Sequence, residues 1–273
     1  MSIINTNQSL QSAIMDVAEV AGYIWQKGWG ERNGGNITIN ITEYATPEWE
    51  NMPALLGKRI PLNMQLPMIK GAYFYCKGTQ KRMRDLSRAP MDNGSIIRIT
   101  PEGDAYEIIA DQPVMPTSEL PSHLMVHNYL IESGSTYKAT LHTHPIELVA
   151  MSHSPRFLES EEMTQTLWSM IPETLAFAPL GIGVVPYELP GSLELANATL
   201  DKIKDYDVTM WEKHGVFAVG LDIMDAFDQV DVLNKAANIY MCARNMGFEP
   251  EGMTPDAMQE IQTVFNLPKY RIQ

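Results

Sequence analysis

Two histidines spaced two positions apart are the residues of this sequence with the clearest potential for chemistry. His142 and His144 lie in the stretch 140–145, which reads Thr-Leu-His-Thr-His-Pro. In a β-strand, side chains two apart point to the same side, so both imidazoles can reach one point in space. Neutral imidazole is a good ligand for zinc and similar divalent metals. The spacing predicts a metal site, although an isolated pair of this kind also fits ordinary strand histidines.

A third histidine and a carboxylate are available to complete such a site. His214 stands between two short strand candidates, and Glu119 follows the sequence Pro-Thr-Ser at 116–118, which is typical of a helix start. Three protein ligands with an open position indicate a catalytic metal, and no cysteine neighbours these histidines to suggest a structural cluster. A carboxylate in the first turn of a helix is also stabilised by the helix dipole. Glu119 is therefore either a proton-transfer group or a helix-end carboxylate.

The remaining histidines and the two cysteines suggest no second site. His123, His127 and His153 fall on helix or loop positions, where we expect surface or supporting groups rather than metal ligands. Cys76 and Cys242 lie far apart in apolar surroundings, which favours buried, reduced thiols over a disulfide. Reduced thiols predict a cytoplasmic protein.

Composition indicates an acidic globular protein. The chain has 273 residues, of which 45% are hydrophobic, and a formal net charge of -13. We expect one domain over residues 1–273, without nucleic acid or membrane as a partner, because both attract basic surfaces. No apolar run approaches the roughly 18 residues of a membrane span, and residues 1–20 do not resemble a signal peptide. A phosphorylated substrate would need local positive potential from a metal, backbone amides or a few basic side chains.

Helices and short strands alternate over the whole length and must position these residues. A helix is predicted from Leu10 to near Gly28, followed by a polar glycine loop at 31–36 and an alternating strand at 37–42. A second helix, capped by residue 117 or 118, leads to the histidine strand, and a helix opening at 160 is expected to end at Pro172, with Glu173 at its exit. Residues 43–70 read as a long excursion. The mixture suggests a largely antiparallel sheet covered by helices.

Four ordered motifs give the chain a resemblance to a known family. They are Glu-Arg-Asn-Gly-Gly-Asn at 31–36, Pro-Thr-Ser-Glu-Leu-Pro at 116–121, His-Thr-His at 142–144 and His-Gly-Val-Phe at 214–217. In this order and spacing they closely resemble the class II aldolase and adducin-head superfamily, over nearly the whole chain. The resemblance implies an α/β fold, a three-layer α/β/α sandwich on a mostly antiparallel central sheet. It also implies a homotetramer with active sites between subunits.

The resemblance carries metal and acid-base roles onto particular residues. One zinc ion per subunit is expected on His142, His144 and His214. Zinc would act as a Lewis acid on the enediolate that remains when the C3–C4 bond of a ketose 1-phosphate breaks. The resemblance makes Glu119 the acid/base at the enediolate carbon, and Glu173 a second acid/base that acts at the active site of a neighbouring subunit.

The expected phosphate site is a set of turns that expose backbone amides to an anion. By resemblance it consists of Asn33, Gly35, Asn36, Gly78, Thr79, Thr117 and Ser118. Glycines let the main chain approach an anion closely, and a helix start points free N–H groups outward. The family usually has Gly-Ser-Gly at 78–80, whereas Gln80 here removes backbone freedom from this wall.

Three functions compete for these motifs. The first is zinc-dependent cleavage of L-rhamnulose 1-phosphate to dihydroxyacetone phosphate and L-lactaldehyde, a step of L-rhamnose catabolism. The second is another activity of the superfamily, on fuculose or a related phosphate, or as an epimerase or dehydratase. The third is an adducin-like scaffold without catalysis. The excursion at 43–70 and the segment 167–173 favour the first, and the three histidines with Glu119 argue against the scaffold.

Overall fold

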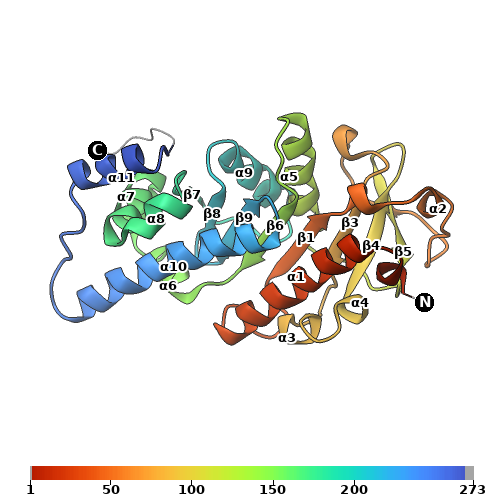
Figure 1. Ribbon diagram of the computed structural model, residues 1–273, viewed down its shortest axis with the longest axis horizontal. Helices are drawn as coiled ribbons and strands as arrows, with labels where there is room; N and C mark the ends of the chain where they lie inside the picture. Colours follow the sequence, from red (N-terminus) through yellow and green to blue (C-terminus); the bar gives the residue numbers. More distant parts are fainter. Residues whose placement is uncertain (1, 268–273) are drawn as a thin grey trace.

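A nine-stranded sheet runs through the computed structural model, which describes residues 2–267 (Figure 1). The strands are β1 Asn36–Asn40, β2 Ile60–Pro61, β3 Tyr73–Lys77, β4 Gly94–Ile99, β5 Ala105–Ala110, β6 Ala139–Thr143, β7 Ile182–Val185, β8 Val208–Trp211 and β9 Gly215–Gly220. Their order across the sheet is β2-β5-β4-β3-β1-β6-β9-β8-β7. Neighbouring strands are antiparallel except β7 and β8, which are parallel. The expected mostly antiparallel sheet is confirmed, and the histidine strand β6 lies near its centre.

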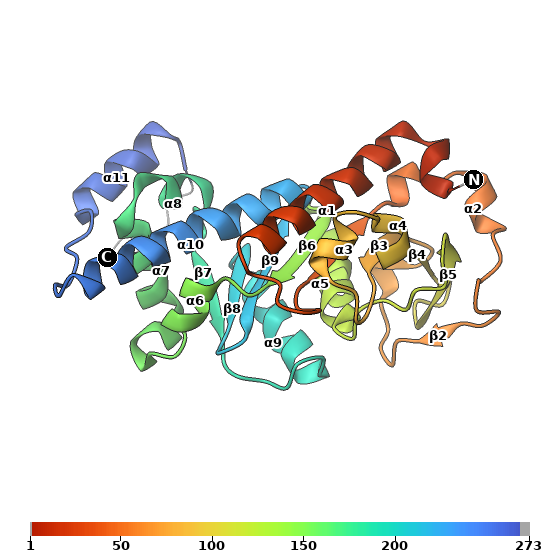
Figure 2. The same cartoon turned by 90° about the horizontal axis from the view of Figure 1, so that it is seen from below.

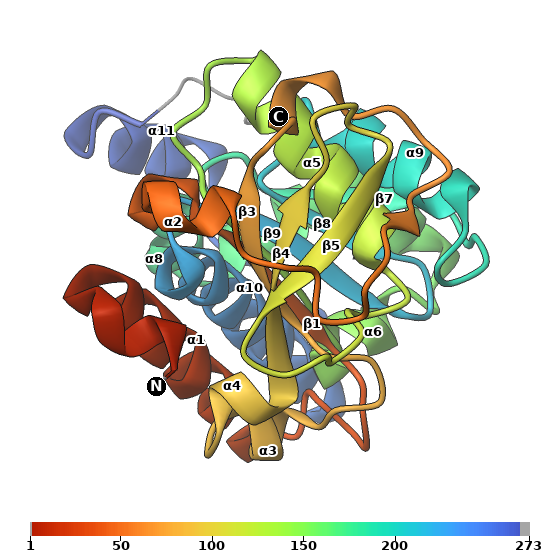
Figure 3. The ribbon, with the colours of Figure 1, turned by 90° about the vertical axis from the view of Figure 1, so that its right-hand side faces the viewer.

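Helices cover both faces of this sheet, as the three-layer prediction requires. They are α1 Gln8–Gln26, α2 Pro47–Glu50, α3 Met83–Leu86, α4 Pro90–Asn93, α5 Leu120–Glu132, α6 Ile146–Met151, α7 Ser160–Met170, α8 Pro172–Phe177, α9 Leu193–Ile203, α10 Ile223–Asn245 and α11 Pro255–Val264. Figures 2 and 3 show α1 and α10 along one face of the sheet and α9 on the other. Helix α5 lies on the same side as α9 and packs against it.

The period-two alternation of the strands divides the core between the two faces. Ile37 of β1 and Leu141 of β6 are fully buried in a cluster with residues of α1 and α10. Residues of α5 and α9 instead pack with Trp211 and Phe217 on the opposite face. Since side chains alternate along β6, the neighbours of Leu141, Thr140 and His142, point to the α5 face. The pleat thus directs His142 away from the larger apolar core.

The excursion at 43–70, whose role could not be read from the sequence, covers one edge of the sheet. It contains α2 and β2, and β2 pairs with β5 over only two residues. The backbone amides of Leu55, Leu62 and Leu66 donate to carbonyls of residues 103–108 at 2.8–2.9 Å. An uncovered edge strand exposes hydrogen-bonding groups that can pair with another chain. The excursion therefore protects β5 with irregular backbone.

Two local expectations were wrong at the C-terminal end of the molecule. Helix α7 ends at Met170, and Pro172 begins α8 rather than ending a helix, so Glu173 lies in the first turn of α8. Proline is tolerated at the first helical position because its missing N–H would have no partner there. Cys242 is exposed, since α10 presents that residue to solvent, whereas Cys76 is buried as predicted.

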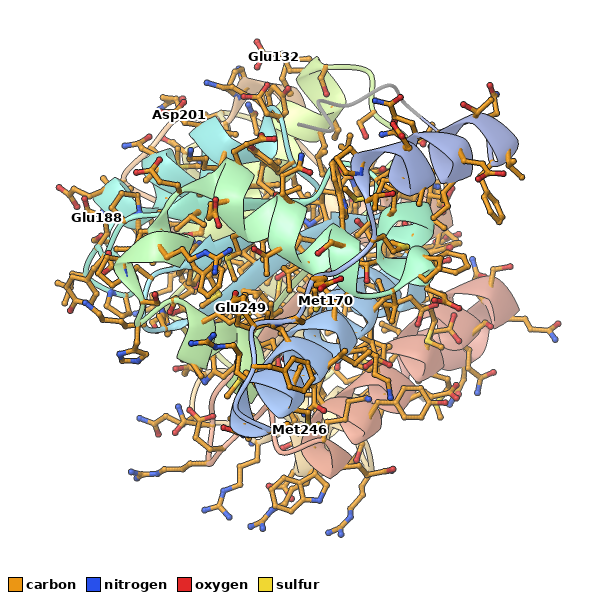
Figure 4. All side chains as sticks on the ribbon, turned by 90° about the vertical axis from the view of Figure 1, so that its left-hand side faces the viewer. Glu132, Met170, Glu188, Asp201, Met246 and Glu249 are labelled. Atoms are coloured by element: carbon orange, nitrogen blue, oxygen red, sulfur yellow. The ribbon has the colours of Figure 1, made fainter. Side chains whose placement is uncertain are left out.

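At the same end of the molecule, ion pairs fix the chain where it leaves α10. Figure 4 looks onto this end, with Glu249 and Met246 labelled beyond the last turn of the helix. The Glu249 carboxylate accepts hydrogen bonds from Arg156, at 2.9 Å, and from Arg244. Helix α11 then packs against α7 and α8, with Trp168, Leu175 and Met258 in a small buried cluster. Among residues 2–267, no helix is long and apolar enough to span a bilayer.

Candidate active site

The structure brings His142, His144 and His214 together. One ring nitrogen from each lies within 4.8 Å of the others. His142 belongs to β6 and His144 follows its end, where the His144 amide donates to the Trp29 carbonyl at 3.0 Å. His214 comes from the short connection between β8 and β9, in which Lys213 takes a left-handed φ of 59°. Because β6 and β9 are neighbours, the hairpin holds the third imidazole beside the first two.

Gly215 allows the three rings to approach one another. A Cβ added there would lie 2.6 Å from the Thr143 carbonyl oxygen and from His144 Cδ2, and 3.0 Å from His142 Cε1. Such contacts are closer than real Cβ atoms tolerate. The glycine that follows His214 is therefore a steric requirement of the site.

The hydrogen bonds of two rings leave bare nitrogens facing each other. His142 Nδ1 lies 2.8 Å from the Val216 carbonyl oxygen, and His144 Nδ1 lies 2.8 Å from a Glu31 carboxylate oxygen. A carbonyl and a carboxylate can only accept, so both Nδ1 atoms carry the hydrogen in the neutral rings. The two Nε2 atoms, 3.1 Å apart, then present lone pairs to each other. A cation between them removes this repulsion, so the residues present fit a bound metal.

Burial keeps two of the rings neutral and therefore able to coordinate a metal. It lowers the pKa of His142 well below its usual range, and the neighbouring histidines add to the shift. It also lowers the pKa of His214 to about 4. His214 Nδ1 is buried without a hydrogen-bond partner among the described residues. Metal binding requires deprotonated imidazole, so these shifts favour a cation over a proton at the site.

The Glu31 contact leads to a first testable prediction. A carboxylate that accepts from a ligand histidine orients the ring, and its loss usually lowers metal affinity ten- to a hundredfold. We expect Glu31→Ala to weaken metal binding by about tenfold, the low end of that range, because the Glu31 side chain is 65% exposed. Competition with a chromophoric chelator measures the affinity. Glu102→Ala, which removes an exposed carboxylate paired with Arg59, is the matched control and should leave metal affinity unchanged.

Glu119 is a second carboxylate beside the histidine cluster, and it faces the Nε2 atoms rather than an Nδ1 atom. Its oxygens lie 3.6 Å from His142 Nε2 and 3.9 Å from His214 Nε2, and it is 8% exposed. The Asn36 side-chain amide donates to it. Burial raises the pKa of Glu119 to about 7, and the charge of Lys77 opposes that shift. A carboxyl group that exchanges its proton near neutral pH is suited to acid-base work.

Local backbone at Glu119 differs from the expected cap. Helix α5 begins at Leu120 with Glu119 itself as the N-cap residue, and neither residue 117 nor 118 caps it. The Thr117 hydroxyl instead accepts from the Glu119 amide at 3.2 Å. Pro121 fits the first turn, where its missing N–H costs no hydrogen bond. Because Glu119 has non-helical backbone, its side chain can turn from the helix end toward the histidines.

A cavity of about 360 Å³ opens in front of these groups. The predicted phosphate residues Asn33, Gly35, Asn36, Thr79, Thr117 and Ser118 line it, together with Glu119 and the three histidines. Gly78 is not among the lining residues; a Cβ there would meet Val114 Cγ1 at 2.4 Å, which places it behind the wall. Gln80 keeps a left-handed φ of 59° although it is not glycine. Glu173 is exposed in α8 and does not line this cavity of the same chain.

Several lining residues lie outside the set predicted from the sequence, although Gln80 and the motif at 31–36 were noted there. They are Glu31, Arg32, Gly34, Lys77 and Gln80. Lys77 is the most unexpected, because it ends the apolar strand β3 and is only 1% exposed. The one sequence signal that could have identified Lys77 is its charge at the end of an otherwise apolar strand.

The three other histidines differ in burial. His153 is exposed as expected, but His123 and His127 are buried on α5, at 0% and 1% exposure. They flank the Thr140 hydroxyl, at 2.7 Å from His123 Nδ1 and 3.3 Å from His127 Nε2. Burial lowers the pKa of His123 to about 3 and that of His127 to about 4. They form a neutral polar layer between α5 and β6, which the apolar periodicity of the helix does not predict.

Comparison with known proteins places this geometry in a family. The sequence profile of the Class II Aldolase and Adducin N-terminal domain matches residues 15–241. The chain is 59% identical to the rhamnulose-1-phosphate aldolase of Bacteroides thetaiotaomicron over 268 residues, which cover 98% of this chain and 99% of that protein. It is 31% identical to the rhamnulose-1-phosphate aldolase of Enterococcus faecalis over 235 residues, 85% of this chain and 84% of that one.

Solved structures agree with the profile. A sugar-phosphate aldolase from Thermotoga maritima is 32% identical, with a TM-score of 0.77 over 89% of this chain and 100% of that one. An L-fuculose 1-phosphate aldolase is 16% identical, with a TM-score of 0.63 over 94% and 98% of the two chains. The second likeness concerns the fold alone.

Proposed function

Since the chain belongs to the class II aldolase and adducin family, we propose that it cleaves L-rhamnulose 1-phosphate to dihydroxyacetone phosphate and L-lactaldehyde, reversibly. The substrate follows the name of the relative that is 59% identical over almost the full length. The observation that carries the proposal is the group formed by three histidines and Glu119 at the floor of one cavity. An adducin-like scaffold would not need these groups to converge.

A metal at the three histidines is the first element of the proposed mechanism. Class II aldolases depend on a metal, and the ring nitrogens of His142, His144 and His214 are positioned to hold one. We propose zinc, one ion per subunit, because three imidazoles with an open position are typical of catalytic zinc. When bound, such an ion supplies the positive charge that stabilises the negative charge developing as the C3–C4 bond breaks.

Proton transfer is assigned to the chain's own carboxylates. Glu119 faces the histidines from the start of α5 and would return a proton to the carbon that loses its bond. The Asn36 amide holds the Glu119 carboxylate in place, so the Asn36 side chain is engaged there rather than free for phosphate. The proposed phosphate contacts therefore fall mainly on Asn33, Gly35, Thr79, Thr117 and Ser118, with Gly78 shaping the wall behind them.

A panel of phosphorylated ketoses tests the substrate. Zinc-loaded protein is incubated with the 1-phosphates of L-rhamnulose, L-fuculose and L-ribulose, and dihydroxyacetone phosphate is followed with a coupled dehydrogenase. We expect L-rhamnulose 1-phosphate to have the highest kcat/KM. Preference for another sugar would move the chain to a different branch of the family. Absence of cleavage of all three would favour the scaffold.

Glu173 is proposed to act at a neighbouring subunit of a homotetramer. Bond cleavage also requires removal of the proton from the C4 hydroxyl, a position different from that served by Glu119. Glu173 is exposed in the first turn of α8 and outside the cavity of its own chain, as a residue donated across an interface would be. Exposed apolar side chains nearby, Phe177 at 64% and Phe265 at 61%, are available to be buried by assembly.

Subunit mixing gives the corresponding prediction. Inactive Glu119→Gln and Glu173→Ala proteins, dissociated and reassembled together, should regain activity, because some interfaces would combine an intact Glu119 with an intact Glu173. Random mixing should restore up to about a quarter of the sites, if each needs one residue from each of two chains. Mixed assemblies confirmed by native mass spectrometry yet without activity would exclude the shared site. Each variant reassembled with itself is the control.

Two broader properties belong to the same proposal. We propose that residues 1–273 form one domain, supported by the single sheet; residues 1 and 268–273 of that span lie outside the described residues. We also propose that the enzyme works in the cytoplasm, supported by the unpaired thiols of Cys76 and Cys242.

A further inference from the structure

Lys77 is the buried basic side chain among the residues that line the cavity. It ends β3, and with 1% exposure it is among the largest fully buried side chains of the described residues. Its Nζ donates to the Asn33 carbonyl oxygen at 3.0 Å. Its own carbonyl accepts from the Thr117 amide at 3.1 Å. The residue thus joins the loop at 31–36 to the turn that leads to Glu119.

The ammonium group of Lys77 is incompletely satisfied. It has three N–H donors, and within residues 2–267 its only hydrogen-bond partner is the Asn33 carbonyl. Nor does any described carboxylate lie within the 4.0 Å of an ion pair with it. A buried charge without a partner is costly, and residues that keep such a charge usually serve a ligand.

The surroundings of Lys77 show which ligand would complete it. The lining of the same cavity includes neutral hydrogen-bonding groups at Asn33, Thr79 and Thr117, and the Glu119 carboxyl, whose charge acts on Lys77 from beyond ion-pair distance. Arg32, the other basic lining residue, is exposed. The chain as a whole carries a formal charge of -13, which repels a dianion. A buried cation beside open amides and hydroxyls compensates locally for that repulsion.

We propose that Lys77 is the counter-charge for the substrate phosphate and sets the preference of this site for phosphorylated ketoses. The assignment rests on the proposed aldolase function and adds a residue that the family motifs did not indicate. Burial lowers the pKa of Lys77 to about 8, so an arriving dianion would favour its charged form. In the free protein, the unpaired charge is expected to reduce the free energy of unfolding. Proteins commonly keep such a destabilising residue where it is needed for function.

Two other roles would give different results. If Lys77 mainly stabilised the loop at 31–36 through Asn33, its loss would destabilise the free protein. If it mainly controlled Glu119, its loss would lower kcat and leave binding of phosphate unchanged. A counter-charge predicts the reverse of both, namely weaker phosphate binding in a protein of equal or higher stability.

The test compares Lys77→Met and Lys77→Arg with the parent protein, all loaded with zinc. Titration calorimetry measures the affinities for inorganic phosphate and for dihydroxyacetone phosphate. Unphosphorylated dihydroxyacetone is the matched ligand, and its affinity is measured by inhibition. We expect Lys77→Met to weaken both phosphorylated ligands by about ten- to a hundredfold, the scale of one charge-assisted hydrogen bond. Dihydroxyacetone should change less than about twofold, and Lys77→Arg should retain most of the phosphate affinity. Lys70→Met, at an exposed lysine, is the control.

Thermal unfolding without ligand supplies the second readout. We expect the melting temperature of Lys77→Met to equal or exceed that of the parent protein, and phosphate to raise it less. Equal weakening of phosphorylated and unphosphorylated ligands would overturn the assignment. So would a destabilised or unfolded Lys77→Met protein alongside a normal Lys77→Arg protein. Failure to cleave L-rhamnulose 1-phosphate would reject the proposed function alone, because the phosphate titrations do not depend on turnover.

Discussion

Replacement of Glu119 by glutamine is expected to lower turnover at least about a hundredfold while the metal stays bound. Glutamine keeps the size of the side chain and can still accept from the Asn36 amide, so the cavity retains its shape. It cannot exchange a proton, and general acid-base catalysis is usually worth 10²–10⁴-fold. The three histidines are unchanged, so metal content should remain that of the parent. Stopped assays of L-rhamnulose 1-phosphate cleavage and metal analysis of the same samples measure both quantities.

A matched substitution separates chemistry from helix capping. Glu147 likewise lies at the start of a helix, in the first turn of α6, and accepts from the side-chain amides of Asn234 and Asn238 at 2.8 and 2.6 Å. It does not line the cavity. Glu147→Gln should therefore leave turnover unchanged. If the two variants lost activity to the same extent, Glu119 would be a helix-end carboxylate and its role in proton transfer would be wrong.

The part of the site predictable from sequence is the part encoded locally. His142 and His144 share a side because strand side chains alternate, and this holds whatever the rest of the chain does. Helix α1 was predicted from apolar spacing, and its buried positions, Leu10, Ile14 and Val17 among them, follow that spacing. The family resemblance added the three-layer arrangement of helices on both faces of the sheet.

Features that depend on contacts between distant segments could not be read in the same way. Lys77 reaches the cavity only because β3 ends beside a loop 44 positions earlier in the chain. His123 and His127 are buried because the Thr140 hydroxyl from β6 meets them, which turns polar positions of α5 into core. Helix α7 ends at Met170 and Pro172 begins α8, so Glu173 lies in a first turn; a proline in the sequence fits the end of one helix and the start of the next equally well.

Removal of one histidine ligand is expected to have the largest effect of any single change. His142→Ala takes away the most buried of the three ligand rings, which packs against Trp211 with ring centroids 4.3 Å apart. The two remaining ligands should bind zinc far more weakly, so metal content and turnover should fall together. Zinc should also cease to raise the melting temperature, because a ligand stabilises a protein only as far as it binds the folded state.

Comparing the stability of the variant with that of the metal-free parent protein separates the loss of metal coordination from the loss of packing. In the parent protein two bare nitrogens face each other at 3.1 Å, so removing one relieves repulsion and offsets part of the lost packing. We therefore expect the variant to be close to the metal-free parent in stability and far from the zinc-loaded parent. His153→Ala, at an exposed histidine outside the cluster, should behave as the parent does with zinc.

Removing the metal with a chelator tests the metal dependence of turnover without a mutation. It also distinguishes metal-dependent cleavage from cleavage through an imine formed on a lysine. An enzyme that works through a lysine imine survives chelators, and borohydride traps its substrate on the lysine. Lys77 is the buried amine in the cavity and would be the site of trapping. We expect chelation to stop turnover, zinc to restore it, and mass spectrometry to find Lys77 unmodified after borohydride with dihydroxyacetone phosphate. Turnover that persisted without metal, with Lys77 labelled, would replace metal-dependent chemistry by an imine mechanism in the same cavity.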